Sequence, residues 1–244
     1  YAVGIVLGSG LSGLADQVMD AVRIPYRDLE GFPVSTVSSH RSEVVVGWLN
    51  VSLVAACRVC GTRLEVERAP GVRPNTPYVL IANHQSMFDI PIVGALLLAN
   101  HPKYISKREL SKWIPSISYN LRRGGNALID RADRAQAVAA IRALGETAQA
   151  RGVSVVIYPE GTRSRSGELK PFKPAGVITL LQAAPALEVV PVTIDESWRL
   201  LCHNLLPVPF GTRIRVRFAD PIPRSAENDP ARISTRYNMV AMPQ

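Results

Sequence analysis

Short apolar runs alternate with helix-like segments along most of this 244-residue chain, and that alternation constrains its fold more than any other feature. The apolar runs at 78–82 and 153–157, the second with one serine, are typical of strands buried in a sheet. A long segment between them, 130–151, repeats alanine and leucine at helical spacing. Strands that alternate with helices predict an α/β fold with a mostly parallel sheet flanked by helices.

The boundaries of the remaining elements follow from the same patterns. Ser86 and Asp130 are suitable N-caps, and Asp89 stands three residues after Ser86 in a capping-box arrangement. We therefore expect strands at 63–68, 78–82, 127–129, 153–157, 187–194 and 213–218, and helices at 48–60, 87–99, 110–121 and 130–151.

The charge balance favours anionic partners. The chain has 28 Lys and Arg against 20 Asp and Glu, a formal net charge of +8. Phosphorylated small molecules, acidic lipid surfaces and acidic carrier proteins suit such a surface. Nucleic acid is not expected, because the basic residues are interspersed with acidic ones and no RNA-binding aromatic signature is present.

The cysteines predict neither a metal site nor a disulfide framework. Cys57 and Cys60 have C-x-x-C spacing, but no second pair or nearby histidine supplies further ligands. Packing in an apolar helix is the favoured interpretation. The odd count of three, with Cys202, fits a reducing compartment.

A histidine and an aspartate follow the first buried strand at a spacing of five residues. His84 and Asp89 could not share a face in mid-helix. If the helix starts near Ser86, however, His84 lies in the entering loop and Asp89 in the first turn. The carboxylate can then hold one ring nitrogen while the other acts as a general base. An ordinary loop histidine beside a capping aspartate is the alternative for this motif taken alone.

Three further segments carry candidate binding residues. The turn after 153–157 contains Glu160, Gly161, Thr162 and Arg163, which combine close backbone approach, a hydroxyl and a guanidinium suited to phosphate. Gly125 and Arg131 flank the strand at 127–129, where an arginine beside a helix start forms an anion site. Pro191 interrupts the strand at 187–194 and is expected to shape a pocket wall or sheet edge.

The order and spacing of these segments over about residues 50–222 resemble the glycerolipid acyltransferase family that includes 1-acylglycerol-3-phosphate acyltransferases. The matching elements are H-x-x-x-x-D at His84 and Asp89, G-x-x-F-x-x-R at Gly125, Leu128 and Arg131, F-P-E-G-T-R at 158–163, the proline motif at Pro191, K-x-E-L at Lys107 and Leu110, and F-K-x-G at 172–176. Leu128 and Tyr158 replace the usual phenylalanines.

The resemblance implies acyl transfer from acyl-CoA or acyl-carrier protein to the free hydroxyl of a lysophosphatidate, giving phosphatidate. His84 and Asp89 would be catalytic. Residues implied to bind substrate are Lys107, Gly125, Arg131, Glu160, Gly161, Thr162, Arg163 and Pro191. No metal or cofactor is implied beyond the acyl thioester as co-substrate. The acyl chains imply association with a membrane surface, on its cytoplasmic face, and the helix expected at 48–60 is the candidate docking element.

A separate N-terminal segment, 1–47, has a βα-type pattern. Its strand at 3–7 leads into a glycine-rich loop, and 31–37 is followed by His40. The stretch resembles a truncated N-terminus of purine nucleoside phosphorylases, and the resemblance implies that Ser9 and His40 would contact phosphate. The expected domains are therefore 1–47 and an acyltransferase domain at 48–244.

Three alternative functions remain from the sequence. Glycerol 3-phosphate or another lysophospholipid could be the acceptor. The chain could instead be a nucleoside phosphorylase fragment, or a lipid-binding module without catalysis.

Overall fold

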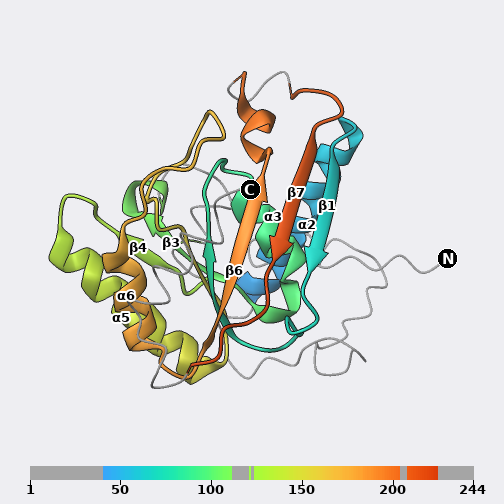
Figure 1. The fold of residues 1–244 in the computed structure, drawn as a ribbon. Coiled ribbons are helices and arrows are strands. Elements are labelled where there is room, and N and C mark those ends of the chain that lie inside the picture. The colour runs from blue at the N-terminus through green and yellow to red at the C-terminus, as the bar shows by residue number, and fades with distance from the viewer. Residues whose placement is uncertain (1–40, 112–120, 122–123, 204–207, 225–244) are drawn as a thin grey trace, which may run out of the picture.

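The computed structural model describes residues 41–111, 121, 124–203 and 208–224, and its centre is a seven-stranded sheet (Figure 1). The strand order is β1-β7-β6-β2-β5-β3-β4. The strands are β1 (Arg63–Arg68), β2 (Tyr78–Ala82), β3 (Lys103–Lys107), β4 (Ala127–Ile129), β5 (Val155–Ile157), β6 (Glu188–Asp195) and β7 (Arg213–Phe218).

Strand direction brings the ends of five strands to one edge of the sheet. β2 pairs in parallel with β5 and β6, and β3 pairs in parallel with β4 and β5. Only the β6–β7 pair is antiparallel among the strands described, and β1 follows β7 in parallel. The loops after β2, β3, β4, β5 and β6 therefore leave from the same edge, which we call the carboxyl edge. Open α/β sheets bind ligands at such an edge.

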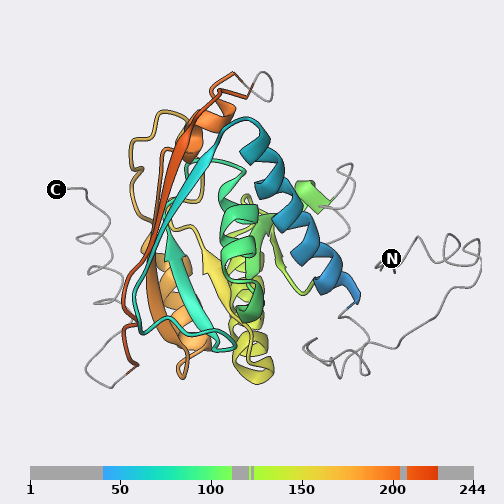
Figure 2. The same ribbon diagram turned by 90° about the vertical axis from the view of Figure 1, so that its right-hand side faces the viewer.

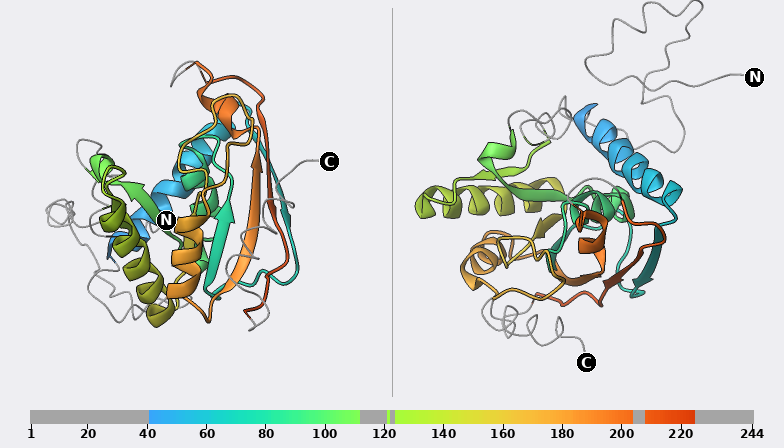
Figure 3. Two further views of the ribbon diagram at one scale, coloured as in Figure 1. Left: turned by 60° about the vertical axis from the view of Figure 1, so that its left-hand side comes forward. Right: turned by 90° about the horizontal axis from the view of Figure 1, so that it is seen from above.

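Helices cover both faces of the sheet, as the views in Figures 2 and 3 show. They are α2 (Arg41–Val59), α3 (Asp89–Leu96), α5 (Arg134–Arg151) and α6 (Pro174–Ala183). The pairs α2–α3 and α5–α6 are each in contact. The sequence therefore predicted the fold class correctly, as a mostly parallel sheet flanked by helices.

The alternation within β2 explains the two layers. Val79 and Ile81 face α5 and α6, whereas Tyr78, Leu80 and Ala82 face α3. All five side chains are fully buried. A central strand with apolar side chains on both faces requires a layer on each side, so this short run fixes the core of the molecule.

Both predicted N-caps were wrong. α3 begins at Asp89, with Phe88 as its N-cap residue. Ser86 Oγ accepts from Phe88 N–H and the Asp89 carboxylate accepts from Ser86 N–H, so these contacts hold a turn that precedes the helix. α5 begins after Asp133, whose carboxylate accepts from the N–H of Gln136. The Gln136 side chain in turn binds Leu128 O and Asp130 N, which makes residues 130–133 a turn.

The structure also contains two elements that the sequence patterns did not predict. β3 carries a lysine at each end, so its apolar run is too short to stand out. α6 begins with Pro174 at its first position, which suits a helix start because proline there loses no hydrogen bond.

The N-terminal elements expected at 3–7 and 31–40 lie outside the described residues, as do Ser9 and His40. The helix expected at 110–121 does so largely, and a short 3₁₀ turn, Arg108–Ser111, is described there. α2 runs across the expected boundary between residues 47 and 48. The division into two domains stays a prediction.

Candidate functional site

His84 and Asp89 meet at the carboxyl edge in the geometry that their spacing predicts. His84 lies in the loop after β2, and Asp89 is the first residue of α3. The ring Nδ1 of His84 donates to Asp89 Oδ2 over 2.8 Å, since an ionised carboxylate can only accept. The His84 side chain is 14% exposed, and Nε2 has no hydrogen bond to any residue the structure describes. The arrangement leaves Nε2 available for proton transfer.

The Asp89 carboxylate is fully buried and has donors on both oxygens. Besides the His84 ring, Oδ2 accepts the backbone N–H groups of Gln85 and Ser86, both over 2.8 Å. Oδ1 accepts the hydroxyl of Ser197 over 2.6 Å. These donors compensate the cost of burying the carboxylate in the interior.

The turn after β5 holds the backbone and the ring of His84. Glu160 Oε1 accepts from the His84 N–H over 2.9 Å, and Ser164 N–H donates to the His84 carbonyl over 2.8 Å. Tyr158 stacks on the imidazole, with ring centroids 4.2 Å apart and planes at 22°. The tyrosine that replaces the usual phenylalanine therefore still supplies an aromatic face for the histidine.

Asn83 fixes the start of the same loop against β6. Its side-chain amide donates to Ile194 O and accepts from Ile194 N, each over 2.7 Å. The asparagine thus continues the parallel pairing of β2 with β6 one residue beyond Ala82. It brings the loop after β2 into contact with the turn after β6 that carries Ser197.

Glu160 is buried, and both of its carboxylate oxygens accept hydrogen bonds from backbone N–H groups. Oε2 accepts from the Lys170 N–H over 3.3 Å. Burial raises the pKa of Glu160 above its ordinary value, although the N–H groups of His84 and Lys170 and the nearby His84 pull it down. In this structure Glu160 supports the His84 backbone, and its contact with substrate stays a prediction.

The raised pKa of Glu160 predicts a pH effect on stability. A carboxyl that holds its proton more tightly when folded favours the folded state below its ordinary pKa of 4.5, and this contribution is lost as pH rises through the raised value. In Glu160→Gln the free energy of unfolding should therefore fall less as pH rises from 4.5 to neutrality. Urea denaturation across this range measures the difference. The same substitution at the exposed Glu146 is the control, and identical pH profiles for Glu160→Gln and the unchanged protein would contradict the prediction.

Cationic side chains approach one another at the ends of β3, β4 and β5. Arg131 follows β4 and is exposed. Desolvation lowers its pKa, the nearby Glu109 raises it and the nearby Arg163 lowers it again. Lys107 is the exposed last residue of β3 and pairs in register with Ile129, two residues before Arg131. The fold thus assembles a positive region from three separate segments.

Two glycines expected to bind substrate have left-handed backbone conformations. Gly161 follows β5 at the carboxyl edge and has φ +68°. Gly125 has φ +73° and precedes β4, so it lies at the opposite edge of the sheet, beside Lys103 at the start of β3. The fold does not bring Gly125 together with His84, and its role in substrate binding stays a prediction. A side chain at Gly161 would also approach the Lys173 ammonium, which lies 3.7 Å from the position of a Cβ atom. Thr162 is exposed beside this glycine. Lys173 is therefore a further cation beside the turn after β5. From the sequence it was named only as part of the F-K-x-G stretch.

Pro191 lies inside the sheet, not at its carboxyl edge. It is buried in β6 beside Ile81 of β2, and its carbonyl accepts from Ala219 N–H. This is the position of a packing residue, and its assignment to substrate binding stays a prediction.

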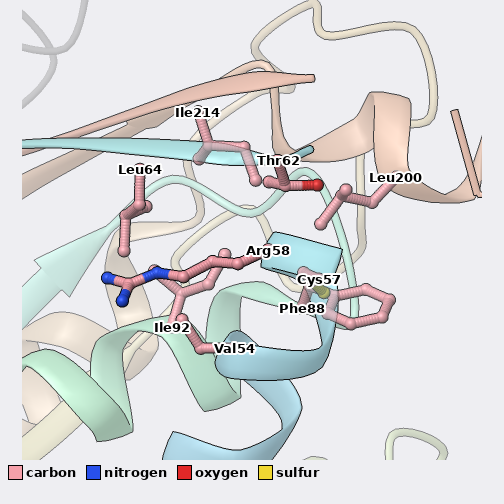
Figure 4. Close-up of a pocket in the computed structure, with 9 residues that line it drawn as sticks. All are labelled: Val54, Cys57, Arg58, Thr62, Leu64, Phe88, Ile92, Leu200 and Ile214. Carbon is pink, nitrogen blue, oxygen red and sulfur yellow. The ribbon is translucent and has the colours of Figure 1, made fainter. Parts of the chain in front are cut away.

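An apolar pocket lies between α2, α3, β1, β7 and the 3₁₀ turn η4 (Ser197–Leu201) (Figure 4). Two of its residues lie near Asp89 in the fold: Phe88 precedes Asp89 in the chain, and Leu200 lies in the same 3₁₀ turn as Ser197, which bonds to Asp89. The lining residues are Val54, Cys57, Arg58, Thr62, Leu64, Phe88, Ile92, Leu200 and Ile214.

The described residues contain no group of three His, Cys, Asp or Glu side chains placed to hold a metal ion. Within the same part of the chain, no helix is both long enough and apolar enough to cross a membrane.

The sequence did not predict the contact of Ser197 with Asp89. It also did not predict that Asn83 would bind the backbone of β6. Ser197 is 108 residues from Asp89 in the chain and belongs to no motif, so nothing in the sequence connects the two. The candidates that the structure brings together are His84, Asp89, Glu160 and Gly161, with Lys107, Arg131 and Arg163 at the same edge.

Over most of its length the chain is similar to 1-acyl-sn-glycerol-3-phosphate acyltransferases. It is 32% identical over 164 residues to 1-acyl-sn-glycerol-3-phosphate acyltransferase alpha of Ovis aries, which covers 67% of this chain and 55% of that protein. It is 30% identical over 137 residues to the 1-acyl-sn-glycerol-3-phosphate acyltransferase of Salmonella typhimurium, which covers 56% of this chain and 54% of the relative. The chain thus spans little more than half the length of these curated relatives.

A different relative matches a short stretch only. Purine nucleoside phosphorylase 1 of Geobacillus stearothermophilus is 48% identical over 52 residues, 21% of this chain and 19% of that enzyme. The resemblance to this second family is therefore confirmed as a short partial match.

The fold and the family model agree with the longer matches. The crystal structure of the 1-acyl-sn-glycerophosphate (LPA) acyltransferase PlsC from Thermotoga maritima has a TM-score of 0.67 to this protein at 21% identity, covering 85% of this chain and 81% of that one. A family model described as Acyltransferase matches residues 63–195, more than half of the chain, and this segment contains His84, Asp89, Arg131 and Glu160. By this match the protein belongs to the Acyltransferase family.

Proposed function

We propose that this protein transfers a fatty acyl group from acyl-CoA or acyl-carrier protein to the free hydroxyl of 1-acylglycerol 3-phosphate, giving phosphatidate. The observation that carries the proposal is the His84–Asp89 pair at the carboxyl edge, with a His84 side chain that is 14% exposed and an Nε2 that bonds to no group within the described residues. The same edge carries Arg131 and Arg163, whose guanidinium groups suit the phosphate of the acceptor.

In the proposed reaction His84 Nε2 takes the proton of the acceptor hydroxyl. The oxygen attacks the thioester carbonyl, a C–O bond forms and the C–S bond breaks, and the leaving thiolate takes the proton from the imidazolium. Asp89 stabilises the imidazolium while it carries this proton. The motifs contain no serine or cysteine nucleophile, so the acyl group passes directly between the substrates without an acyl-enzyme.

Positioning of the two substrates supplies much of the expected rate gain. Arg131 and Arg163 are proposed to hold the acceptor phosphate, with Lys107 at the neighbouring strand end. Gly161 and Thr162 offer a close backbone approach and a hydroxyl.

Association with the cytoplasmic face of a membrane is part of the proposal. The acceptor carries an acyl chain, and α2 exposes Leu53 and Val59. The net charge of +8 adds attraction to acidic lipids. Sedimentation with vesicles of acidic phospholipid, compared with neutral vesicles, tests this part. Equal recovery in the supernatant with both, at low salt, would contradict it.

The function is tested with the purified full chain, labelled acyl-CoA and a panel of acceptors. Lysophosphatidate should be acylated in preference to glycerol 3-phosphate and to lysophospholipids with larger headgroups. Faster transfer to one of those acceptors would move the assignment to it. Lipid binding with no transfer to any acceptor, from acyl-CoA or acyl-carrier protein, would refute the proposed activity.

Arg131→Ala should raise the Michaelis constant for the phosphate-bearing acceptor by about tenfold or more, because a charge-assisted hydrogen bond to phosphate is lost. The constant for the acyl thioester should change much less. Steady-state kinetics with each substrate varied in turn measure both values. Arg142→Ala, an exposed arginine of α5, is the matched control, and equal effects of Arg131→Ala on both substrates would contradict the assigned role.

A further inference from the structure

We propose that Ser197 is a positioning residue of the His84–Asp89 pair, acting through the Asp89 oxygen that the histidine does not contact. This inference rests on the proposed function, in which Asp89 orients the catalytic base.

The two oxygens of Asp89 are held by different parts of the chain. The three donors to Oδ2 come from the loop after β2, namely the His84 ring and the N–H groups of Gln85 and Ser86. Within the described residues Oδ1 accepts one hydrogen bond, from the Ser197 hydroxyl. That hydroxyl therefore decides whether the carboxylate is fixed at one oxygen or at both.

The hydrogen bond between Ser197 and Asp89 is short and fully buried. Oγ and Oδ1 are 2.6 Å apart, the range of a charge-assisted O–H···O⁻ bond, and both residues have zero exposed surface. No water can replace a lost donor in such a place without rearrangement, so a buried oxygen would be left unsatisfied. The carboxylate would then tilt toward other donors, and the His84 ring would lose its fixed orientation.

The backbone before Ser197 is shaped to make this contact. β6 ends at Asp195, and Glu196 has φ +66° and ψ +3°, a left-handed conformation that residues with a side chain seldom adopt. An ion pair between Glu196 and Arg199 spans this turn. On the other side, Trp198 packs against Gly167 in the loop that follows β5. The left-handed residue and two neighbouring contacts thus hold the backbone from which the serine hydroxyl reaches Asp89.

A second buried serine allows the positioning role to be separated from packing. Ser154 is also fully buried, and its hydroxyl accepts from Tyr78 N–H over 3.0 Å. It precedes β5, at the edge of the sheet opposite His84. Ser154→Ala removes the same atom from an equally buried position that does not contact the pair.

The test compares Ser197→Ala and Ser154→Ala in the full chain. Ser197→Ala should lower kcat by about 10- to 100-fold, the usual scale for losing a hydrogen bond to a charged group, while leaving both Michaelis constants nearly unchanged. Ser154→Ala should leave kcat per folded molecule as it was. A Ser197→Ala enzyme with unchanged kcat, or with a loss that only follows the fraction folded, would overturn the inference.

A substrate-free measurement separates this inference from the proposed function. The downfield NMR resonance of the His84 Nδ1 proton reports its bond to Asp89, and its absence in His84→Ala identifies it. It should shift or broaden in Ser197→Ala and stay in place in Ser154→Ala. A resonance that is identical in Ser197→Ala would overturn the positioning role. A resonance that responds in a protein with no acyl transfer to any acceptor would refute the proposed function and leave the contact as a structural coupling.

Discussion

His84→Ala is expected to abolish acyl transfer to lysophosphatidate while leaving the fold intact. The substitution removes the group proposed to take the hydroxyl proton, and general-base catalysis contributes about 10²- to 10⁴-fold in rate. The fold should survive because the imidazole is at the protein surface in part and contacts Tyr158 by one face, so no sealed cavity is formed.

The measurement is turnover of labelled acyl-CoA with lysophosphatidate, together with thermal unfolding of the same preparation. His203→Ala, an exposed histidine in the turn after η4, makes the same chemical change away from the pair and should keep full activity. Turnover by folded His84→Ala within a few-fold of the unchanged protein would refute the assignment of His84 as the base.

Asp89→Asn should impair both activity and stability. An amide offers one oxygen acceptor where the carboxylate offers two, so its NH₂ group would face donors already in place at Ser197 or at Gln85 and Ser86. Leaving such buried groups unpaired costs about 2–4 kcal/mol in the free energy of unfolding. With the NH₂ group in the place of Oδ2, the His84 ring would also lose the acceptor that fixes its tautomer, for which a loss of about a thousandfold or more in kcat is expected.

Urea denaturation and steady-state kinetics check the two parts separately. Asp133→Asn is the matched control, because asparagine caps a helix about as well as aspartate and α5 should be unaffected. If Asp89→Asn matched Asp133→Asn in stability and rate, the buried carboxylate would have neither of the roles assigned to it.

Elements with strong local patterns were predicted well from sequence. β2 and β5 are uninterrupted apolar runs, and all of their side chains are buried, so period and composition were sufficient. β3 was missed because its stability comes from neighbours on both sides, β4 and β5, and not from its own apolar content. The N-caps were wrong because Ser86 and Asp130 each hold a turn instead, accepting from the N–H groups of Phe88 and Ala132, and the helices begin after those turns.

In the candidate site too, contacts within one stretch of chain were predictable from sequence, and contacts between distant segments were not. The five-residue spacing of His84 and Asp89 was enough to predict their hydrogen bond, because both partners belong to one loop and the first turn of one helix. Glu160 was assigned to the site from its motif, but its contact with the His84 backbone depends on β5 pairing beside β2. Ser197 depends on β6 lying on the other side of β2, and no local pattern carries that information.

The sequence by itself therefore determined the layered α/β architecture and the residues proposed as the base, its carboxylate partner and the phosphate-binding cations. Those properties depend on residue type and on spacing within one or two turns of chain. Only the tertiary structure decided which groups surround the pair, because the strand order brings the turns after β2, β5 and β6 together from positions more than 100 residues apart. Strand order depends on how the two faces of the sheet pack against the helices. Sequence patterns could not predict it, and the hydrogen bond from Ser197 to Asp89 was therefore found only in the folded chain.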